Sequence, residues 1–266
     1  MAGMATLRNR RVKRYGWIPD LPDQRDQGYA APPVARLPGS TDLRRGFPPP
    51  YDQGDLGSCT ANAIAGAFQF TRRKVKQGPD FVPSRLFVYY NERVVEGTVN
   101  EDSGAMLRDG MKVCAKLGVC PEHSRPPAPG DWPYDVSKFA VKPPAACYRV
   151  ALRYQLLRYQ RVAQSLAQMK GCLAQGYPFV FGFAVYEGFE SAEVARTGDV
   201  PLPAPGERLL GGHAVVAVGY DDAAQQFFIR NSWGARWGKK GYGTMPYAYL
   251  ADADLAADFW TIRQTE

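Results

Sequence analysis

The hydrophobic pattern changes character near the middle of the chain. The stretch from Cys59 to about Lys76 places apolar residues at mostly helical offsets, and Gly78-Pro79 ends it. Similar patterns predict helices opened by Ser84, between Ser103 and Gly118, and from Val162 to Leu173. The second half instead carries short β-branched and aromatic runs, which predict buried strands over 179–185, 214–218, 227–229 and 259–262. A helical half followed by a β-rich half predicts an α+β fold with room for a cleft between two lobes.

Two other regions are rich in proline and lack this periodicity. The first 40 residues are interrupted by Pro19, Pro22, Pro32, Pro33 and Pro38. Because proline fixes its own φ and pushes its predecessor toward extended geometry, this segment predicts an extended strap rather than a packed element. Residues 187–210 are expected to form a long surface loop between two strands.

Charge and cysteine usage exclude several classes of function. The formal charge is +7, but five basic residues lie in the first 14 residues, which contain no acidic residue. Such a tail without interleaved aromatic residues is usually solvated, so we expect no nucleic-acid partner. With five cysteines and two histidines in no metal-ligand spacing, we expect no metal and no cofactor.

No apolar run approaches the roughly 20 residues that span a bilayer, so we expect no contact with a membrane. No apolar segment follows the basic tail as in a secretory signal peptide. The location therefore stays open between the cytoplasm and export by a signal-independent route.

Cys59 is the candidate nucleophile. It follows the turn Gly57-Ser58 and opens the first predicted helix, where unpaired backbone N–H groups and the helix dipole favour the reactive thiolate. A cysteine alone is more often a small buried hydrophobe, and we assign that role to Cys114 and Cys172 within predicted helices.

Three further side chains complete a possible site. His213, after Gly211-Gly212 at the expected head of a strand, can exchange a proton with the thiol. Asn231, in the turn 231–234, can accept from the ring N–H and fix its tautomer, and Trp233 can cover that bond. Gln53 can donate, with the Cys59 backbone N–H, to a developing oxyanion. Each of these residues alone also fits ordinary turn chemistry or packing, but the set in this order is specific.

With these segments the sequence resembles the papain-like cysteine proteases. Segments 52–59, 212–220 and 229–242 carry the resemblance, which extends through most of residues 40–262. It implies a catalytic domain over 40–266, with a helical lobe at about 55–130, a β-rich lobe at about 131–266 and the active site between them. It also implies the roles of oxyanion donor for Gln53, nucleophile for Cys59, acid and base for His213, and orienting residue for Asn231.

The resemblance further implies where substrate binds. Ser103-Gly104 falls where the family places a glycine pair that bonds the substrate backbone, so both are candidate substrate-binding residues, together with Gly212 and Trp233. Leu56 stands where the family has a disulfide cysteine, and no cysteine lies near Asp102. Gly212 replaces a residue that is often acidic or polar, which we expect to shift the pH profile. The segment from Gly16 to Asp26 is similar to one found in bacterial members.

We therefore expect a cysteine endopeptidase that hydrolyses peptides or proteins through an acyl-thioester, without a cofactor. Residues 1–39 are expected to form an inhibitory pro-segment, with a cleavage junction between Leu37 and Ser40. A disordered tail without regulatory role is the alternative for this segment. A deamidase or transamidase, and a non-catalytic binding module, are the alternatives for the function.

Overall fold

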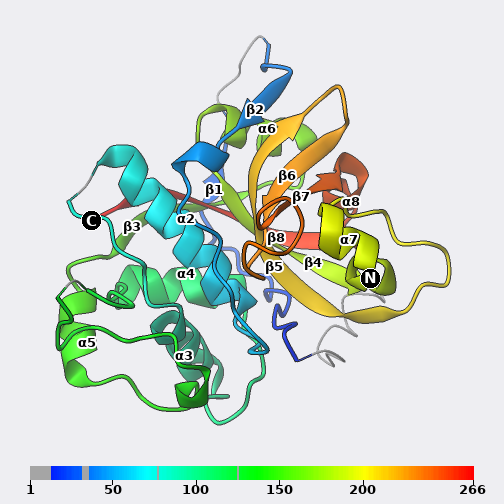
Figure 1. The fold of residues 1–266 in the computed structure, drawn as a ribbon. Helices are drawn as coiled ribbons and strands as arrows, with labels where there is room; N and C mark the ends of the chain where they lie inside the picture. The colour runs from blue at the N-terminus through cyan, green and yellow to red at the C-terminus, as the bar shows by residue number, and fades with distance from the viewer. Residues whose placement is uncertain (1–12, 32–35, 77, 125) are drawn as a thin grey trace.

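The computed structural model describes residues 13–31, 36–76, 78–124 and 126–266, whose arrangement is shown in Figure 1. Arg8, Arg10 and Arg11 of the basic tail, and the prolines at 32 and 33, lie outside the described residues. In the described part no helix is long and apolar enough to cross a membrane.

The helices of the described residues are α2 (Cys59–Val75), α3 (Arg85–Glu96), α4 (Leu107–Lys116), α5 (Ala145–Ala151), α6 (Leu166–Ala174), α7 (Ala192–Thr197) and α8 (Tyr247–Ala251). In Figure 1, α2 to α5 group on one side of the molecule, whereas α6, α7 and α8 lie beside the sheet. Single 3-10 turns lie at η1 (Arg44–Gly46), η2 (Val136–Lys138) and η3 (Glu187–Glu190). The predicted start of α3 is confirmed, since the Ser84 hydroxyl accepts from the Phe87 N–H; the helix ends at Gly97, which has φ +74° and was not predicted.

A single mixed sheet of the described strands forms the other side of the molecule. Its strands are β1 (Gly28–Tyr29), β2 (Ser40–Asp42), β3 (Leu156–Val162), β4 (Phe179–Tyr186), β5 (Leu209–Asp221), β6 (Gln226–Arg230), β7 (Tyr242–Pro246) and β8 (Ala256–Thr265). The order is β1-β3-β8-β4-β5-β6-β7, and β2 pairs with β5 outside that path. Only β1 and β3 pair in parallel among the described strands. Helices on one side and this sheet on the other confirm the predicted α+β fold.

Two hydrophobic clusters hold these layers together. The first joins α2, α3 and α4 to one face of the sheet, and the second joins α6 and α8 to β4, β5 and β6. Trp132 and Cys147, which follow the expected lobe boundary at about residue 130, also lie in the first cluster, where helix and sheet residues meet. Helix α2 packs against β5 and β8.

Three sequence-based boundaries were wrong. The helix predicted from Val162 begins only at Leu166, because Val162 still pairs with Tyr29 as the last residue of β3. The region 187–210 is not all loop, since it contains η3 and α7. His213 does not stand at the head of a strand: β5 begins at Leu209, and His213 pairs with Phe183 of β4.

Candidate active site

Cys59 is the first residue of α2 and is fully buried. The Ser58 side chain does not cap the helix, because its hydroxyl bonds the Tyr134 hydroxyl at 2.5 Å. The Ser58 hydroxyl therefore does not accept from the backbone N–H groups in the first turn of α2. The Gly57 N–H donates to the Asp102 carboxylate at 3.0 Å. This bond ties the turn before Cys59 to the Ser103-Gly104 segment, at the place where the resemblance implies a missing disulfide.

His213 lies in β5, Asn231 directly follows β6, which pairs with β5, and the two side chains meet inside the protein. The His213 Nε2 lies 2.8 Å from the Asn231 Oδ1, which also accepts from the Ser232 N–H at 2.8 Å. Since a backbone N–H can only donate, the shared atom is the amide oxygen, and the His213 Nε2 must carry the hydrogen. The other ring nitrogen, Nδ1, then has its lone pair free to take a proton, and it makes no hydrogen bond to any described residue.

An aromatic shell surrounds the imidazole. The Trp233 ring lies 5.0 Å from the His213 ring, Phe183 lies 5.7 Å away and Phe189 lies 6.1 Å away, measured between centroids. Burial lowers the pKa of His213 to about 4, although the bond to Asn231 acts in the opposite direction and the nearby Arg14 guanidinium lowers it slightly further. In this state the imidazole is neutral at physiological pH.

Gln53 lies in the same site with a fixed side chain. Its Oε1 accepts from the Ser232 hydroxyl at 2.5 Å, and its backbone N–H donates to the Ser232 carbonyl at 2.9 Å. With the oxygen held in this way, the Nε2 points away from Ser232 and donates to the carbonyls of Arg14 and Leu56, both at 2.8 Å.

The N-terminal strap lies directly across this group of residues. Its Arg14 carbonyl accepts the Gln53 side chain, and the Tyr15 ring lies 5.9 Å from the His213 ring. The carbonyl of Gly57 leaves no room for a side chain at Gly16, since a Cβ there would lie 1.8 Å from the Gly57 oxygen. Figure 1 shows this blue segment passing between the helices and the sheet.

The four candidate substrate-binding residues differ in how they meet the strap. Gly212 accepts from the Trp17 N–H at 3.0 Å, and Gly104 packs against Gly16 with φ +80° and no room for a Cβ. Trp233 lies under the Arg14 guanidinium at 3.9 Å. Ser103 instead bonds the Thr98 hydroxyl and does not reach the strap through any described hydrogen bond.

Sequence reasoning missed Ala105. Its N–H donates to the Gly16 carbonyl at 2.7 Å, and its carbonyl accepts from the Ile18 N–H at 3.0 Å. These are backbone groups, so no side-chain motif marks the position. It also missed Glu190 of η3, whose carboxylate bonds both Arg14 and the Tyr15 hydroxyl, because an acidic residue in a predicted surface loop carries no signal of its own.

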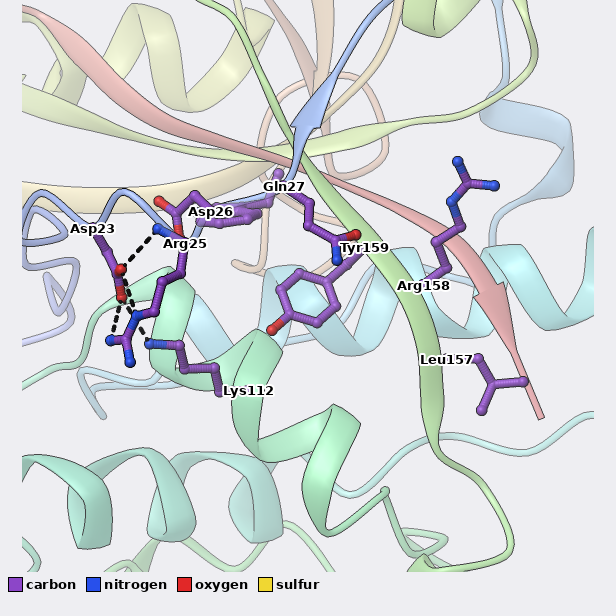
Figure 2. Close-up of a pocket in the computed structure, with 9 residues that line it drawn as sticks. Asp23, Arg25, Asp26, Gln27, Lys112, Leu157, Arg158 and Tyr159 are labelled. Carbon is purple, nitrogen blue, oxygen red and sulfur yellow. Dashed lines mark hydrogen bonds and ion pairs between the residues drawn. The ribbon is translucent and has the colours of Figure 1, made fainter.

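Beyond Ile18 the strap is held by charged side chains. The Asp26 carboxylate pairs with Arg108 of α4 at 2.6 Å and with Arg161 of β3 at 3.0 Å. The Asp20 side chain is buried and accepts from the Trp260 indole N–H at 2.9 Å. Figure 2 shows the outer part of this contact, where Asp23 bonds Arg25 and Lys112.

The remaining cysteines are packed in the interior. None of the five, all of which lie in the described residues, forms a disulfide. Burial raises the pKa of the Cys172 thiol to about 11, and burial also raises that of Cys114. Across the described residues, no group of three or more histidine, cysteine or acidic side chains is arranged to hold a metal ion.

The comparison with known proteins agrees with this geometry. The chain matches the family model described as papain family cysteine protease over residues 37–251. An uncharacterized peptidase C1-like protein of Acanthamoeba polyphaga mimivirus is 41% identical over 280 residues, which cover 95% of this chain and 87% of that protein. A cathepsin B-like protein of Giardia intestinalis is 30% identical over 231 residues, 79% of this chain and 69% of that protein.

Solved structures show the same relationship. Xylellain, a cysteine protease from Xylella fastidiosa, is 48% identical with a TM-score of 0.87, and the match covers 98% of this chain and 100% of xylellain. A procathepsin B from Trypanosoma congolense shares the fold at 17% identity, with a TM-score of 0.70 over 96% of this chain and 87% of that one. The expected likeness to papain-like proteases, with bacterial members among the similar proteins, is confirmed.

Proposed function

Since the chain belongs to the papain family of cysteine proteases, we propose that its peptide-bond hydrolysis runs through Cys59, His213, Asn231 and Gln53. The observation that carries this assignment is the Asn231 oxygen shared by the Ser232 N–H and the His213 ring. It fixes the tautomer in which Nδ1 can act as a base. We also propose a bacterial origin for the chain, supported by its identity to xylellain.

In this mechanism the Cys59 sulfur attacks the carbonyl carbon of the scissile peptide bond. The oxyanion that forms accepts from the Gln53 Nε2 and from the Cys59 backbone N–H. His213, having taken the thiol proton, gives it to the leaving amine as the acyl-thioester forms. It then removes a proton from water, whose oxygen attacks the thioester and releases the acid and the thiol.

We propose that the strap, residues 1–39, is an intramolecular inhibitor and that the chain is a zymogen. The Arg14 carbonyl occupies the Gln53 donor that the oxyanion needs, and Tyr15 is buried against the His213 ring. A cut between Leu37 and Ser40 would separate this strap from the catalytic domain over 40–266.

The strap also acts on the proton equilibrium of the site. A thiolate is stabilised by an imidazolium beside it, but burial under the strap keeps the pKa of His213 at about 4. Removing the strap exposes the imidazole to water and takes away the positive charge of Arg14. Both changes raise the pKa of His213 toward its ordinary value of about 6.5, which makes the imidazole a stronger base for the Cys59 proton.

The geometry favours a peptidase over a binding module. A module that only binds peptides does not require a fixed histidine tautomer or a buried amide donor such as that of Gln53. A deamidase or transamidase would use the same acyl-thioester, and only the nature of the substrate separates those reactions from peptide hydrolysis.

A single kinetic experiment tests these assignments. The full chain is incubated with a short fluorogenic peptide while mass spectrometry follows its N-terminus. We expect hydrolysis to accelerate as residues 1–39 are released, and added strap peptide to suppress it. Gln53→Ala should lower kcat by on the order of 10²–10³ with little change in KM.

The matched controls are two cysteine variants. Cys59→Ala should abolish hydrolysis, whereas Cys172→Ala, at a cysteine of α6 buried in the second hydrophobic cluster, should retain it. Hydrolysis by Cys59→Ala would refute the nucleophile. Full activity with the N-terminus still attached would refute the inhibitory role of the strap.

A further inference from the structure

One acidic side chain beside the catalytic residues, that of Glu190, binds the strap. Glu190, the last residue of η3, pairs with the Arg14 guanidinium through one carboxylate oxygen and accepts from the Tyr15 hydroxyl through the other. The same guanidinium lies 3.9 Å from the centre of the Trp233 ring. A carboxylate and an aromatic face together are what a planar guanidinium prefers to bind.

The protein holds Glu190 in place independently of the strap. The preceding Phe189 is buried, with its ring 5.2 Å from both Phe183 and Trp233. The Gly188 N–H donates to the Glu207 carboxylate, and the Ser191 N–H donates to the Gly188 carbonyl at 3.2 Å. These contacts fix the backbone at Glu190 without involving the strap, so η3 presents the carboxylate on this side of Trp233 whichever guanidinium it binds.

The position of Glu190 relative to the reaction follows from the role of His213. The leaving amine must reach the imidazole to be protonated, so the leaving segment of a substrate lies over His213 and Trp233. Tyr15 and Arg14 occupy this side, whereas Gly16 to Ile18 lie between Ala105 and Gly212 on the other side.

We propose that Glu190 and Trp233 form a specificity subsite that receives an arginine or lysine side chain from the leaving segment of the substrate, within two residues of the scissile bond. This inference rests on the proposed function. The strap fills the subsite with Arg14, whose own carbonyl bonds the catalytic amide of Gln53. When the strap leaves, Glu190 is left as a carboxylate without this guanidinium beside an exposed aromatic face.

The test compares internally quenched peptides that differ only in the two residues after the scissile bond. Arginine, glutamine and glutamate are placed there in turn, and mass spectrometry identifies the bond that is cut. The full chain is used, because the fraction of molecules with the strap bound lowers kcat/KM for every peptide by the same factor. The ratio between peptides therefore reports the subsite and not the strap.

We expect the arginine peptide to be cut about 10-fold more efficiently than the glutamine peptide, as for a partly exposed charge-assisted hydrogen bond. In Glu190→Gln this ratio should fall to about 1, and in Glu190→Lys the glutamate peptide should become the preferred one. Glu193→Gln is the matched control, since Glu193 pairs with Arg196 on the exposed side of α7 and should leave the ratio unchanged.

The outcomes are distinguishable. Ratios that do not respond to Glu190→Gln or Glu190→Lys, even if the overall rate rises, would show that Glu190 only clasps the strap and would overturn the subsite. Absence of hydrolysis of every peptide by every variant would instead contradict the peptidase function on which the subsite rests.

Discussion

The two halves of the strap contact the protein by different physical means. Residues 14–18 enter the site and bind through backbone hydrogen bonds, through two fully buried aromatic side chains, Tyr15 and Trp17, and through the ion pair of Arg14 with Glu190. Residues 20–29 lie outside the site and bind through ion pairs of Asp23 and Asp26, through hydrogen bonds that Asp20 accepts, and through the short parallel pairing of β1 with β3.

We call residues 14–18 the blocking half of the strap and residues 20–29 its anchoring half, because the two sets of contacts have different consequences. The blocking half occupies the same donors, acceptors and apolar surfaces that a substrate needs, so substrate competes with it directly. The anchoring half contacts Arg108 on α4 and Arg161 on β3 through one carboxylate, that of Asp26, and so joins a helix to the sheet. Its ion pairs respond to pH and salt, whereas the buried aromatic contacts of the blocking half do not.

The largest effect is expected from Trp17, the centre of the blocking half. Its ring fills a space that exists only because Gly182 has no side chain, since a Cβ there would lie 1.9 Å from the ring. Replacing a buried tryptophan by alanine removes about 3–5 kcal/mol of packing, so Trp17→Ala should raise the initial hydrolysis rate of the uncut full chain by on the order of 100-fold. The rate is measured with a fluorogenic peptide before any release of residues 1–39.

Leu21→Ala is the control within the strap. The Leu21 side chain is 57% exposed, so its removal should leave the rate nearly unchanged. Equal rates for Trp17→Ala and the parent chain would show that the blocking half does not hold the strap in place.

Substitutions of Asp26 and Asp23 in the anchoring half should raise the hydrolysis rate less than Trp17→Ala does, and by different amounts. Asp26 pairs with Arg108, whose side chain is only 5% exposed, and breaking a buried pair leaves the remaining charge without compensation. We expect Asp26→Ala to raise the hydrolysis rate of the uncut full chain by about 10-fold. This effect is smaller than that of Trp17→Ala, because the contacts of the blocking half remain and Arg161 still pairs with Asp258.

Asp23→Ala should change the same rate by less than about twofold, because its partner Arg25 is exposed and Lys112 lies 3.5 Å away. Indistinguishable rates for the two variants would mean that the anchor acts through the backbone of β1 and not through buried charge.

Several parts of this site could be predicted from the sequence because local signals agreed with one another. The start of α2 at Cys59 followed from its apolar spacing and the preceding turn, and the cap at Ser84 followed from its residue type. Asn231 was recognisable from its turn. In each case the structure uses a preference that the residues already have on their own.

Other parts depend on distant contacts. Strand β3 was missed because Arg158, Gln160 and Arg161 break the apolar pattern, and the strand is held by pairing with β8 and by the ion pairs of Arg161. Gly211-Gly212 resembled the end of a loop, but both are buried in β5, where Gly212 makes room for Trp17. No local pattern could reveal a glycine that is required by a residue almost 200 positions away.

The smallest expected effect is a change in pH dependence, in which the two halves of the strap oppose each other. Burial, with a smaller contribution from Arg14, lowers the pKa of His213 to about 4 while the strap is docked. With the strap released, in the open state, the pKa of His213 returns to its ordinary value of about 6.5. Between about pH 6.5 and 4 the open state therefore binds the His213 proton first, and acidification favours release of the strap. Burial and the Asp258 charge raise the pKa of Asp20 to about 7 in the docked strap. Between about 4 and 7 the docked state therefore keeps the Asp20 proton that the open state loses, and acidification favours docking.

Because these two contributions have opposite sign, docking in the parent chain should vary little between about pH 4 and 6.5. Asp20→Asn removes one of them, so in that variant docking should weaken on acidification, by at most about tenfold per pH unit. The measurement is the protection of the Trp17 and Ile18 amides against hydrogen exchange, which report the bonds to Gly212 and Ala105. The variant loses a carboxylate oxygen that accepts from Arg108 or Trp260, so its docking is weaker at every pH, and the slope rather than the level is the readout. Asp23→Asn should keep the parent slope, and a parent-like slope in Asp20→Asn would refute the opposition between the two halves.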